Sequence, residues 1–308
     1  MTLILVAANA DHTIQWSDRR LSSNGVPFQE APKATVINLS DGRLIMGYSG
    51  LALASGLITQ RFLQETAQES SGAEDLTTRL QSALEKKLRY TPGVLPPQRR
   101  LSVLLAGYLN TDGGTRFISS LLSNWEDPRN NIYLTDPAPS FAHHWWMLRE
   151  GRPWREPFTC AIGQWPSVSL ERLATLKSLM MNGASVSTLS RVGVKLITDA
   201  AANPGSDNTV GTNIMVTVLP SDWSQAHSGQ YVPSSASLTT FFPDVVVAGR
   251  DGMAITEWTL SADEPDTPPV ALPFANRNDP CPCGSRNKYK RCCERRLRPP
   301  RERDSDFR

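Results

Sequence analysis

Long apolar runs are scarce in this sequence of 308 residues, and their scarcity argues against an integral membrane protein. The longest of them, such as Leu3–Ala8, fall far short of the roughly 20 residues that a membrane-spanning helix needs. That first run also lacks the basic stretch that opens a secretory signal peptide. We therefore expect a cytoplasmic protein without a membrane span.

Several common motifs are also missing. The sequence contains no P-loop, no glycine-rich dinucleotide motif and no serine-hydrolase elbow, which argues against the enzyme classes that depend on them. Cysteine is rare, with only 5 residues, and four of these lie within 13 positions near the end of the chain. Such clustering favours a metal site in a reducing compartment over a disulfide framework.

Neither charge sign is in large surplus overall, because the sequence has 32 basic and 30 acidic residues. The distribution is uneven, however: residues 275–308 carry 11 basic and 5 acidic side chains, a net charge of +6, and the rest of the chain has a net charge of −4. A basic module after an acidic body favours an acidic partner. We predict a main domain over 1–260, a proline- and acid-rich linker over 261–274, a small module over 275–298 and a disordered charged tail over 299–308.

Hydrophobic patterning predicts groups of strands that are separated by pairs of helices. A capping box formed by Ser71 and Glu74 is expected to open the second helix. The helical stripes cover residues 53–67, 76–88, 170–180 and 189–200. The expected strands cover residues 2–8, 13–17, 34–39, 43–48, 101–109, 115–120, 158–162 and 214–219, with a last hairpin over 244–249 and 253–260.

The order of these elements predicts the fold class. Hairpin-sized spacings within each strand group indicate antiparallel sheets, and helices that come in pairs argue against a Rossmann fold. Two antiparallel sheets packed face to face, with a helix pair on each outer face, satisfy this order. We therefore predict an α+β protein with a four-layer αββα sandwich and a small C-terminal zinc-binding module.

The first residues carry a candidate nucleophile. A small residue after Met1 normally permits removal of that methionine, which would make Thr2 the mature N-terminus. A threonine hydroxyl can be activated by its own α-amine, whose pKa of about 7.7–8.0 leaves a useful neutral fraction near pH 7. An acid and a base should lie close by. Asp18 ends the second predicted strand and Lys33 precedes the third.

Four segments together resemble the opening of the proteasome β-subunit family, which belongs to the N-terminal nucleophile (Ntn) hydrolases. They are residues 2–8, Trp-Ser-Asp-Arg-Arg at 16–20, Lys33 and Gly-Tyr-Ser-Gly at 47–50. In processing, the nearest analogue is the bacterial HslV-type subunit, in which loss of the initiator methionine alone exposes the threonine. The resemblance is best over residues 2–56 and continues weakly to about residue 220. It implies the αββα fold, threonine-type hydrolysis of amide or peptide bonds and, because family members commonly form rings, a homo-oligomer.

The resemblance also implies a role for each site residue. Thr2 would be the nucleophile, Lys33 would lower the pKa of the Thr2 α-amine, and Asp18 would hold Lys33 in place. The amide of Gly50, or that of Gly47, would stabilise the oxyanion. Asp207 would match the acidic residue near the α-amine.

Departures from the family pattern keep a second interpretation open. The spacing from Asp18 to Lys33 is one residue shorter than usual, and Gln164 and Val210 occupy positions where the family often has serines. Neither side chain replaces a hydroxyl in its combined donor and acceptor role. The alternative is a catalytically inactive, proteasome-like scaffold that serves as a zinc-dependent adaptor for protein or RNA.

The most specific motif lies near the end of the chain. Cys281, Cys283, Cys292 and Cys293 form the pattern C-x-C-x8-C-C, and the Gly-Ser pair at 284–285 allows a tight turn between them. Four thiolates suit a closed tetrahedral Zn²⁺ site, and so short a module needs a metal to fold. Two disulfides or four free thiols are the alternatives, although adjacent cysteines disfavour simple pairing.

This segment resembles the SEC-C motif, best known from the SecA translocase. The resemblance implies zinc binding and docking of a partner protein. The basic side chains around the cysteines would contact an acidic protein surface, or RNA and the ribosome. Two other features are weaker. His143 and His144 are predicted to lie in a loop, and we favour a role in aromatic packing over a role of this loop as a lid. Cys160 is predicted to be a small buried residue on a strand.

Overall fold

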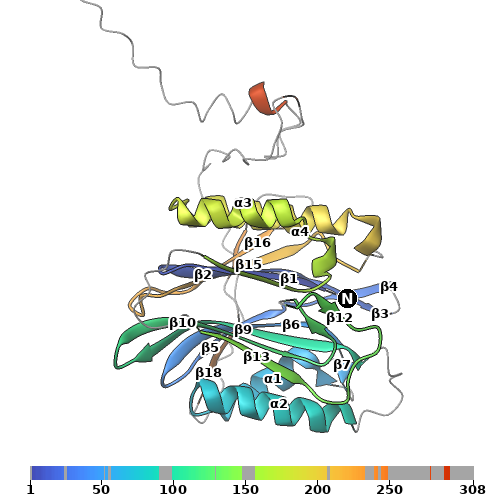
Figure 1. Ribbon diagram of the computed structural model, residues 1–308, viewed down its shortest axis with the longest axis vertical. Helices are drawn as coiled ribbons and strands as arrows, with labels where there is room; N and C mark the ends of the chain where they lie inside the picture. Colours follow the sequence, from blue (N-terminus) through green and yellow to red (C-terminus); the bar gives the residue numbers. More distant parts are fainter. Residues whose placement is uncertain are drawn as a thin grey trace, which may run out of the picture.

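The computed structural model describes residues 2–23, 26–51, 53–54, 57–89, 99–128, 130–147, 157–206, 209–232, 239–241, 244–248, 278 and 288–291. Two six-stranded sheets face each other in this part of the chain (Figure 1). Helices α3 (Leu170–Met181) and α4 (Val186–Ala201) lie on the outer face of one sheet. Helices α1 (Thr59–Gln68) and α2 (Ala73–Arg89) lie on the outer face of the other, so the mixed α+β class is confirmed.

The first sheet has the strand order β14-β1-β2-β15-β16-β17, and every neighbouring pair is antiparallel. The predicted N-terminal hairpin lies inside this sheet as β1 and β2, although β1 begins one residue later than expected. The strands are β1 (Leu3–Ala8), β2 (His12–Asp18), β14 (Phe158–Gly163), β15 (Ile214–Pro220), β16 (Ser228–Val232) and β17 (Thr239–Phe241).

The second sheet has the strand order β13-β10-β9-β6-β5-β18. Its pairs are antiparallel except for β18, which runs parallel to β5. The strands are β5 (Ala34–Asn38), β6 (Gly42–Gly50), β9 (Leu101–Thr111), β10 (Gly114–Ser123), β13 (Ala142–Met147) and β18 (Asp244–Val247).

Several short elements lie outside the two large sheets. Three two-stranded ribbons are formed by β3 (Arg20–Ser23) with β4 (Val26–Glu30), β7 (Leu53–Ala54) with β8 (Leu57–Ile58), and β11 (Glu126–Asp127) with β12 (Ile132–Tyr133). Single 3-10 turns cover Trp165–Ser167, Pro204–Ser206 and Tyr289–Arg291. Among the described residues, none of the helices has the length and apolar character that crossing a membrane requires.

Three separate clusters of buried side chains hold the layers together. One lies between the first sheet and helices α3 and α4, and a second lies between the other sheet and helices α1 and α2. The third lies between the two sheets, where strand β1 contributes Ile4 and Val6. All six residues of β1 are buried because this strand has packed neighbours on both faces, which explains its continuous apolar sequence.

Two sequence predictions are wrong in detail, and a third is tested only in part. Residues 57–58, predicted as helix, pair with 53–54 in the β7–β8 ribbon before α1 starts at Thr59. His143 and His144, predicted in a loop, lie on strand β13, where the ring of His143 packs against that of Trp145. The predicted strand at 244–249 pairs with β5 as β18, while its expected hairpin partner over 253–260 lies outside the described residues.

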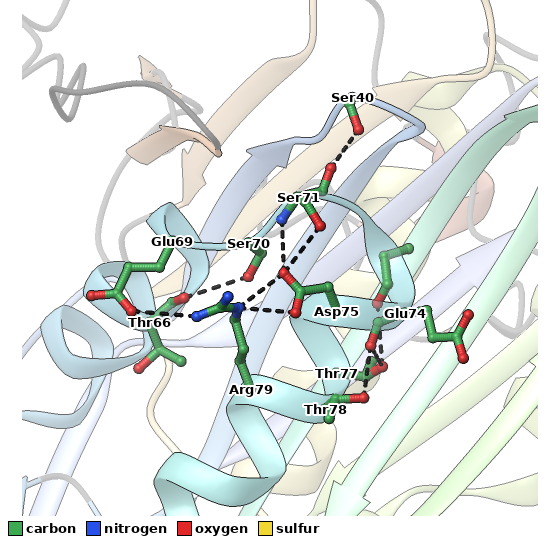
Figure 2. A network of polar contacts seen from close by, with 11 residues as sticks. Ser40, Thr66, Glu69, Ser70, Ser71, Glu74, Asp75, Thr77, Thr78 and Arg79 are labelled. Carbon is green, nitrogen blue, oxygen red and sulfur yellow. Dashed lines mark hydrogen bonds and ion pairs between the residues drawn. The ribbon is translucent and has the colours of Figure 1, made fainter.

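The start of helix α2 also differs from the predicted capping box. Asp75, not Glu74, accepts hydrogen bonds from the amide and the hydroxyl of Ser71 (Figure 2). The first helical amide, that of Ala73, donates instead to the carboxylate of Asp41 in the β5–β6 turn. The cap therefore comes from a residue 32 positions earlier in the chain, which ties the helix to the second sheet.

Candidate active site around Thr2

Thr2 immediately precedes β1, and its backbone is held on both sides. Its carbonyl oxygen accepts a hydrogen bond from the amide of Gln164 and another from the hydroxyl of Ser49, each at 3.0 Å. Thr2 as a whole is 4% exposed. The residue that the sequence singled out as a nucleophile thus sits in a fixed position between the ends of β6 and β14.

Lys33 lies directly before β5 and reaches the side chain of Thr2. Its Nζ donates to Oγ1 of Thr2, to the carbonyl oxygen of Arg20 at 2.6 Å, and to Oδ2 of Asp18 at 3.3 Å. An ammonium group has three protons, so these three acceptors satisfy it fully. Lys33 is 1% exposed, and its charge is compensated inside the protein by Asp18.

Asp18 ends β2 and is the acceptor for several groups besides Lys33. Oδ1 accepts from the amide of Leu3 at 2.9 Å, and Oδ2 accepts from the amides of Arg20 at 3.1 Å and Gly211 at 3.0 Å. The structure therefore brings Thr2, Asp18 and Lys33 together, as the resemblance implied. The fifth predicted site residue, Asp207, lies outside the described residues.

Gly50 is the last residue of β6, and its backbone has a φ of +112°, in a region that favours glycine. The amide of the next residue, Leu51, donates to the carbonyl of Arg100 at 2.8 Å. Residue pairs in an antiparallel ladder alternate between pairs that exchange hydrogen bonds and pairs whose amides point away from each other. The bond from Leu51 to Arg100 places the pair of Gly50 with Leu101 in the second group. The amide of Gly50 therefore points away from β9, whereas the same alternation directs that of Gly47 toward β9.

The loop after β14 approaches Thr2 from the opposite side. Gly163 has a φ of +82°, and a Cβ atom at this position would lie 1.8 Å from the carbonyl oxygen of Thr2. The side-chain amide of Gln164 donates to the hydroxyl of Thr209 at 3.3 Å. Val210, at the second position where the family often has serine, is 1% exposed and belongs to the core beneath α3 and α4.

Glu126 is a site residue that the sequence did not reveal. Its carboxyl oxygens lie 2.9 and 3.0 Å from the amide nitrogen of Gly163, and the residue is 3% exposed. Burial raises the pKa of this carboxyl to about 8. In the sequence, Glu126 stands in a polar stretch between two predicted strands and resembles an ordinary turn residue.

The four cysteines of the predicted zinc site lie outside the described residues, and the described part of the chain contains no other group of three or more metal-ligating side chains. Residues 277–295 match the SEC-C motif, which confirms that part of the sequence resemblance. The same region is similar to SecA protein translocase subunits. Identity is 61% over 31 residues with the subunit of Desulfovibrio desulfuricans and 47% over 51 residues with that of Polynucleobacter necessarius. These matches span only 4% and 5% of the SecA chains.

About three quarters of the chain is similar in fold to solved structures of Anbu, described as an ancestral β-subunit. The Yersinia bercovieri protein is 13% identical, with a TM-score of 0.49 over 76% of this chain and 88% of that one. Anbu from Pseudomonas aeruginosa, solved as a helical assembly, is 12% identical with the same TM-score over 77% and 88% of the two chains.

Proposed function

We propose that this chain is a threonine-type N-terminal nucleophile hydrolase of amide or peptide bonds, built on the αββα sandwich of that class. The observation that carries the proposal is the contact between Nζ of Lys33 and Oγ1 of Thr2, closed from solvent and backed by Asp18. Burying a lysine is costly, and a threonine with no role beyond starting a strand does not require one beside its hydroxyl.

The proposed reaction begins when removal of Met1 exposes the α-amine of Thr2. Oγ1 attacks the carbonyl carbon of the scissile amide while its proton moves to the α-amine. The positive charge of Lys33 favours the neutral, proton-accepting form of that amine. Collapse of the tetrahedral intermediate breaks the C–N bond, and the α-ammonium group returns its proton to the leaving amine. Water then hydrolyses the ester on Thr2 by the same proton transfers.

Gly50 is the proposed oxyanion donor. Its amide points away from β9, in contrast to that of Gly47, and this difference supports Gly50 over the alternative. One such donor is typically worth about 3 kcal/mol of transition-state stabilisation. Asp207 remains part of the proposal as an acidic group near the α-amine.

The test uses the full-length chain and an epoxyketone, an electrophile that needs both the hydroxyl and the α-amine of one residue. Intact mass should show loss of Met1, and peptide mapping should place a single adduct on Thr2. Thr2→Ala should abolish labelling, and Lys33→Ala should slow it by about 100-fold or more. Asp18→Asn should slow it less, and Lys177→Ala, on the exposed side of α3, is the matched lysine control.

Gln164 and Val210 favour the second candidate, the inactive scaffold, because both replace hydroxyl groups that often support the site in this class. Gln164→Ser should raise the labelling rate if the missing hydroxyl limits the enzyme. A folded chain that has lost Met1 but never labels between about pH 6 and 9 would contradict the hydrolase and leave the scaffold as the function.

We further propose that Cys281, Cys283, Cys292 and Cys293 hold one Zn²⁺. The chemistry of this donor set fits, because four thiolates in a short segment match a closed structural site. The metal would supply folding energy to the small module and take no part in the reaction at Thr2. Metal analysis should find about one zinc per chain, lost in a double Cys281→Ser and Cys283→Ser variant and kept in Cys160→Ser. Absence of zinc from freshly reduced protein would contradict the site.

The proposed partner of this module is an acidic protein surface in the cytoplasm. Lys290 and Arg291, in the 3-10 turn at Tyr289–Arg291, and Lys288, which precedes it, are exposed, and the surrounding sequence has a net positive charge. Such a surface attracts acidic groups in a salt-dependent manner. Tight binding of a single-stranded RNA to the full chain, lost on replacing these three residues with glutamine, would assign RNA as the partner instead.

A further inference from the structure

We propose that Glu126 is a positioning residue for Thr2: its carboxyl group fixes the turn at Gly163 and Gln164, and this turn fixes the carbonyl of Thr2. The catalytic consequence rests on the proposed function above, whereas the positioning itself does not.

The first step is a contact that bridges the two sheets. Glu126 opens β11, three residues after β10 of the second sheet ends at Ser123. Gly163 ends β14 of the first sheet and pairs with Leu3 of β1. The hydrogen bonds from the Gly163 amide to the Glu126 carboxyl therefore connect the second sheet to the end of β14, which pairs with the strand that Thr2 precedes.

The second step is the close contact between the turn and Thr2. The absence of a side chain at Gly163 lets its backbone lie against the carbonyl of Thr2. The following amide, that of Gln164, donates to this carbonyl at 3.0 Å. A shift of Gly163 would move the donor of Gln164 with it, because the two amides belong to adjacent peptide units. The position of Thr2 is thus coupled to the position of Glu126.

The third step is the support of Glu126 itself. Its amide donates to the hydroxyl of Ser123 at 3.0 Å, and this hydroxyl lies 2.9 Å from that of Ser102. The backbone of Glu126 is therefore anchored by a pair of buried serines. Such anchoring leaves the carboxyl little freedom to follow a displaced Gly163.

The raised pKa of Glu126 makes the carboxyl largely neutral at pH 7, because the value of about 8 lies above this pH. A neutral carboxyl still accepts from the amide of Gly163 through its unprotonated oxygen. Glutamine has the same capacity at the same length, whereas methionine keeps the length and loses the strong acceptor. The pair Glu126→Gln and Glu126→Met therefore separates hydrogen bonding from packing.

The experiment measures hydrogen exchange and Thr2 labelling in the full-length chain. In fragments that cover residues 158–168, exchange in Glu126→Met should be about tenfold faster or more, and exchange in Glu126→Gln should stay within about threefold of the parent. The limiting rate of epoxyketone labelling should fall in Glu126→Met, with little change in the half-saturating concentration, and recover in Glu126→Gln. Asp127→Asn, a neighbouring buried carboxylate that bonds Asn130, is the matched control.

Unchanged exchange at 158–168 in Glu126→Met would overturn the proposal. If Glu126→Met fails to fold, Ser102→Ala replaces it, because loss of one supporting hydroxyl should raise exchange in the same fragments by a smaller factor. If the parent chain never labels, the hydrolase proposal fails, and the exchange measurement still decides whether Glu126 positions Thr2.

Discussion

The carboxylate of Asp18 accepts hydrogen bonds from three backbone amides and from Lys33, with no exposure to solvent. The amides belong to β1, to the start of β3 and to the segment before β15, so one side chain joins three parts of the chain. A buried ion pair contributes little when its desolvation cost is counted, but removing one partner leaves the other charge buried and unpaired.

We therefore expect Asp18→Ala to lower the free energy of unfolding by about 3–5 kcal/mol, because Lys33 and three amides lose their acceptor. Asp18→Asn should cost less, since its carbonyl oxygen still accepts. Urea denaturation measures both values. Asp112→Ala, in the exposed β9–β10 turn, is the control and should stay within about 0.5 kcal/mol of the parent. A cost below about 1 kcal/mol for Asp18→Ala would contradict this account.

Glu126 should give the protein a distinctive pH dependence. Burial raises its pKa from 4.5 to about 8, so the folded state keeps a proton in this window that the unfolded state has released. Stability from this group is present below about pH 4.5 and is lost as the pH rises toward 8. The acidic neighbours, Asp127 beside it and the Cys160 thiol on β14, do not offset this loss because neither supplies a positive charge.

The glutamine side chain of Glu126→Gln does not titrate. The free energy of unfolding of this variant, relative to that of the parent, should therefore rise by a few kcal/mol between pH 5 and pH 8. Urea unfolding of both chains at several pH values measures this difference. The comparison cancels the titration of the other carboxylates, which the two chains share. A difference that stays constant from pH 5 to pH 8 would show that Glu126 is ionised in the folded protein throughout.

The resemblance carried by short segments was enough to single out Thr2, Asp18 and Lys33, which the structure places in contact. Glu126 could not be found in this way, because its partner Gly163 lies 37 residues later and meets it only when the two sheets pack. The preference for Gly50 over Gly47 likewise depends on the pairing register of β6 with β9, which is a property of the folded sheet.

At the scale of elements, periodicity predicted the long strands and helices and failed for short or edge elements. Strands β7 and β8 have two residues each, too few to display alternation. Strand β13 lies at the edge of its sheet, where His143 and His144 are both partly buried. The cap of α2 was misassigned because Asp41 reaches it from another turn, a contact that no local pattern contains.

Strand β15 offers a test of how the two sheets pack. Thr217 lies between Met215 and Leu219, which both belong to the cluster between the sheets, and it pairs with Gln15 of β2. Its hydroxyl is fully buried and has no hydrogen-bond partner among the described residues. An unsatisfied buried hydroxyl typically costs about 1–3 kcal/mol, whereas a methyl group of the same shape would pack without this cost.

Thr217→Val should therefore raise the free energy of unfolding by about 1 kcal/mol. Thr77→Val in α2 is the matched control, because this buried hydroxyl donates to the carbonyls of Ala73 and Glu74. The free energy of unfolding of this control should equal that of the parent or be lower. Thermal and urea unfolding of the two variants decide the matter, and a clear loss of stability in Thr217→Val would mean that its hydroxyl has a partner after all.

At the scale of the whole molecule, the body and the SEC-C segment differ in how each can gain stability. The body has three hydrophobic clusters that stack helices and sheets in layers. The SEC-C segment of 277–295 is too short to build a comparable core, and a metal is the proposed source of its stability. The boundary near residue 261 remains a prediction, and it requires that loss of the metal leave the body folded.

Thiol reactivity tests this separation, because the fifth cysteine belongs to the body. Desolvation of the partly buried Cys160 thiol, aided by the nearby Glu126 and Asp127, raises its pKa to about 12. At pH 8 only about one thiol in ten thousand would be ionised, and the thiolate is the reactive form. An alkylating reagent should therefore modify four cysteines rapidly after a strong chelator is added, and the fifth only after the body unfolds.

Mass spectrometry counts the adducts, and circular dichroism reports whether the body stays folded during the reaction. Cys160→Ser should show the four rapid adducts and no slow one. The double variant Cys281→Ser and Cys283→Ser should show two rapid adducts without any chelator, because a site with two remaining thiolates holds zinc weakly. Five slow thiols in the presence of chelator would refute the metal site. Loss of the body's circular dichroism signal on chelation would instead refute the independence of the two parts.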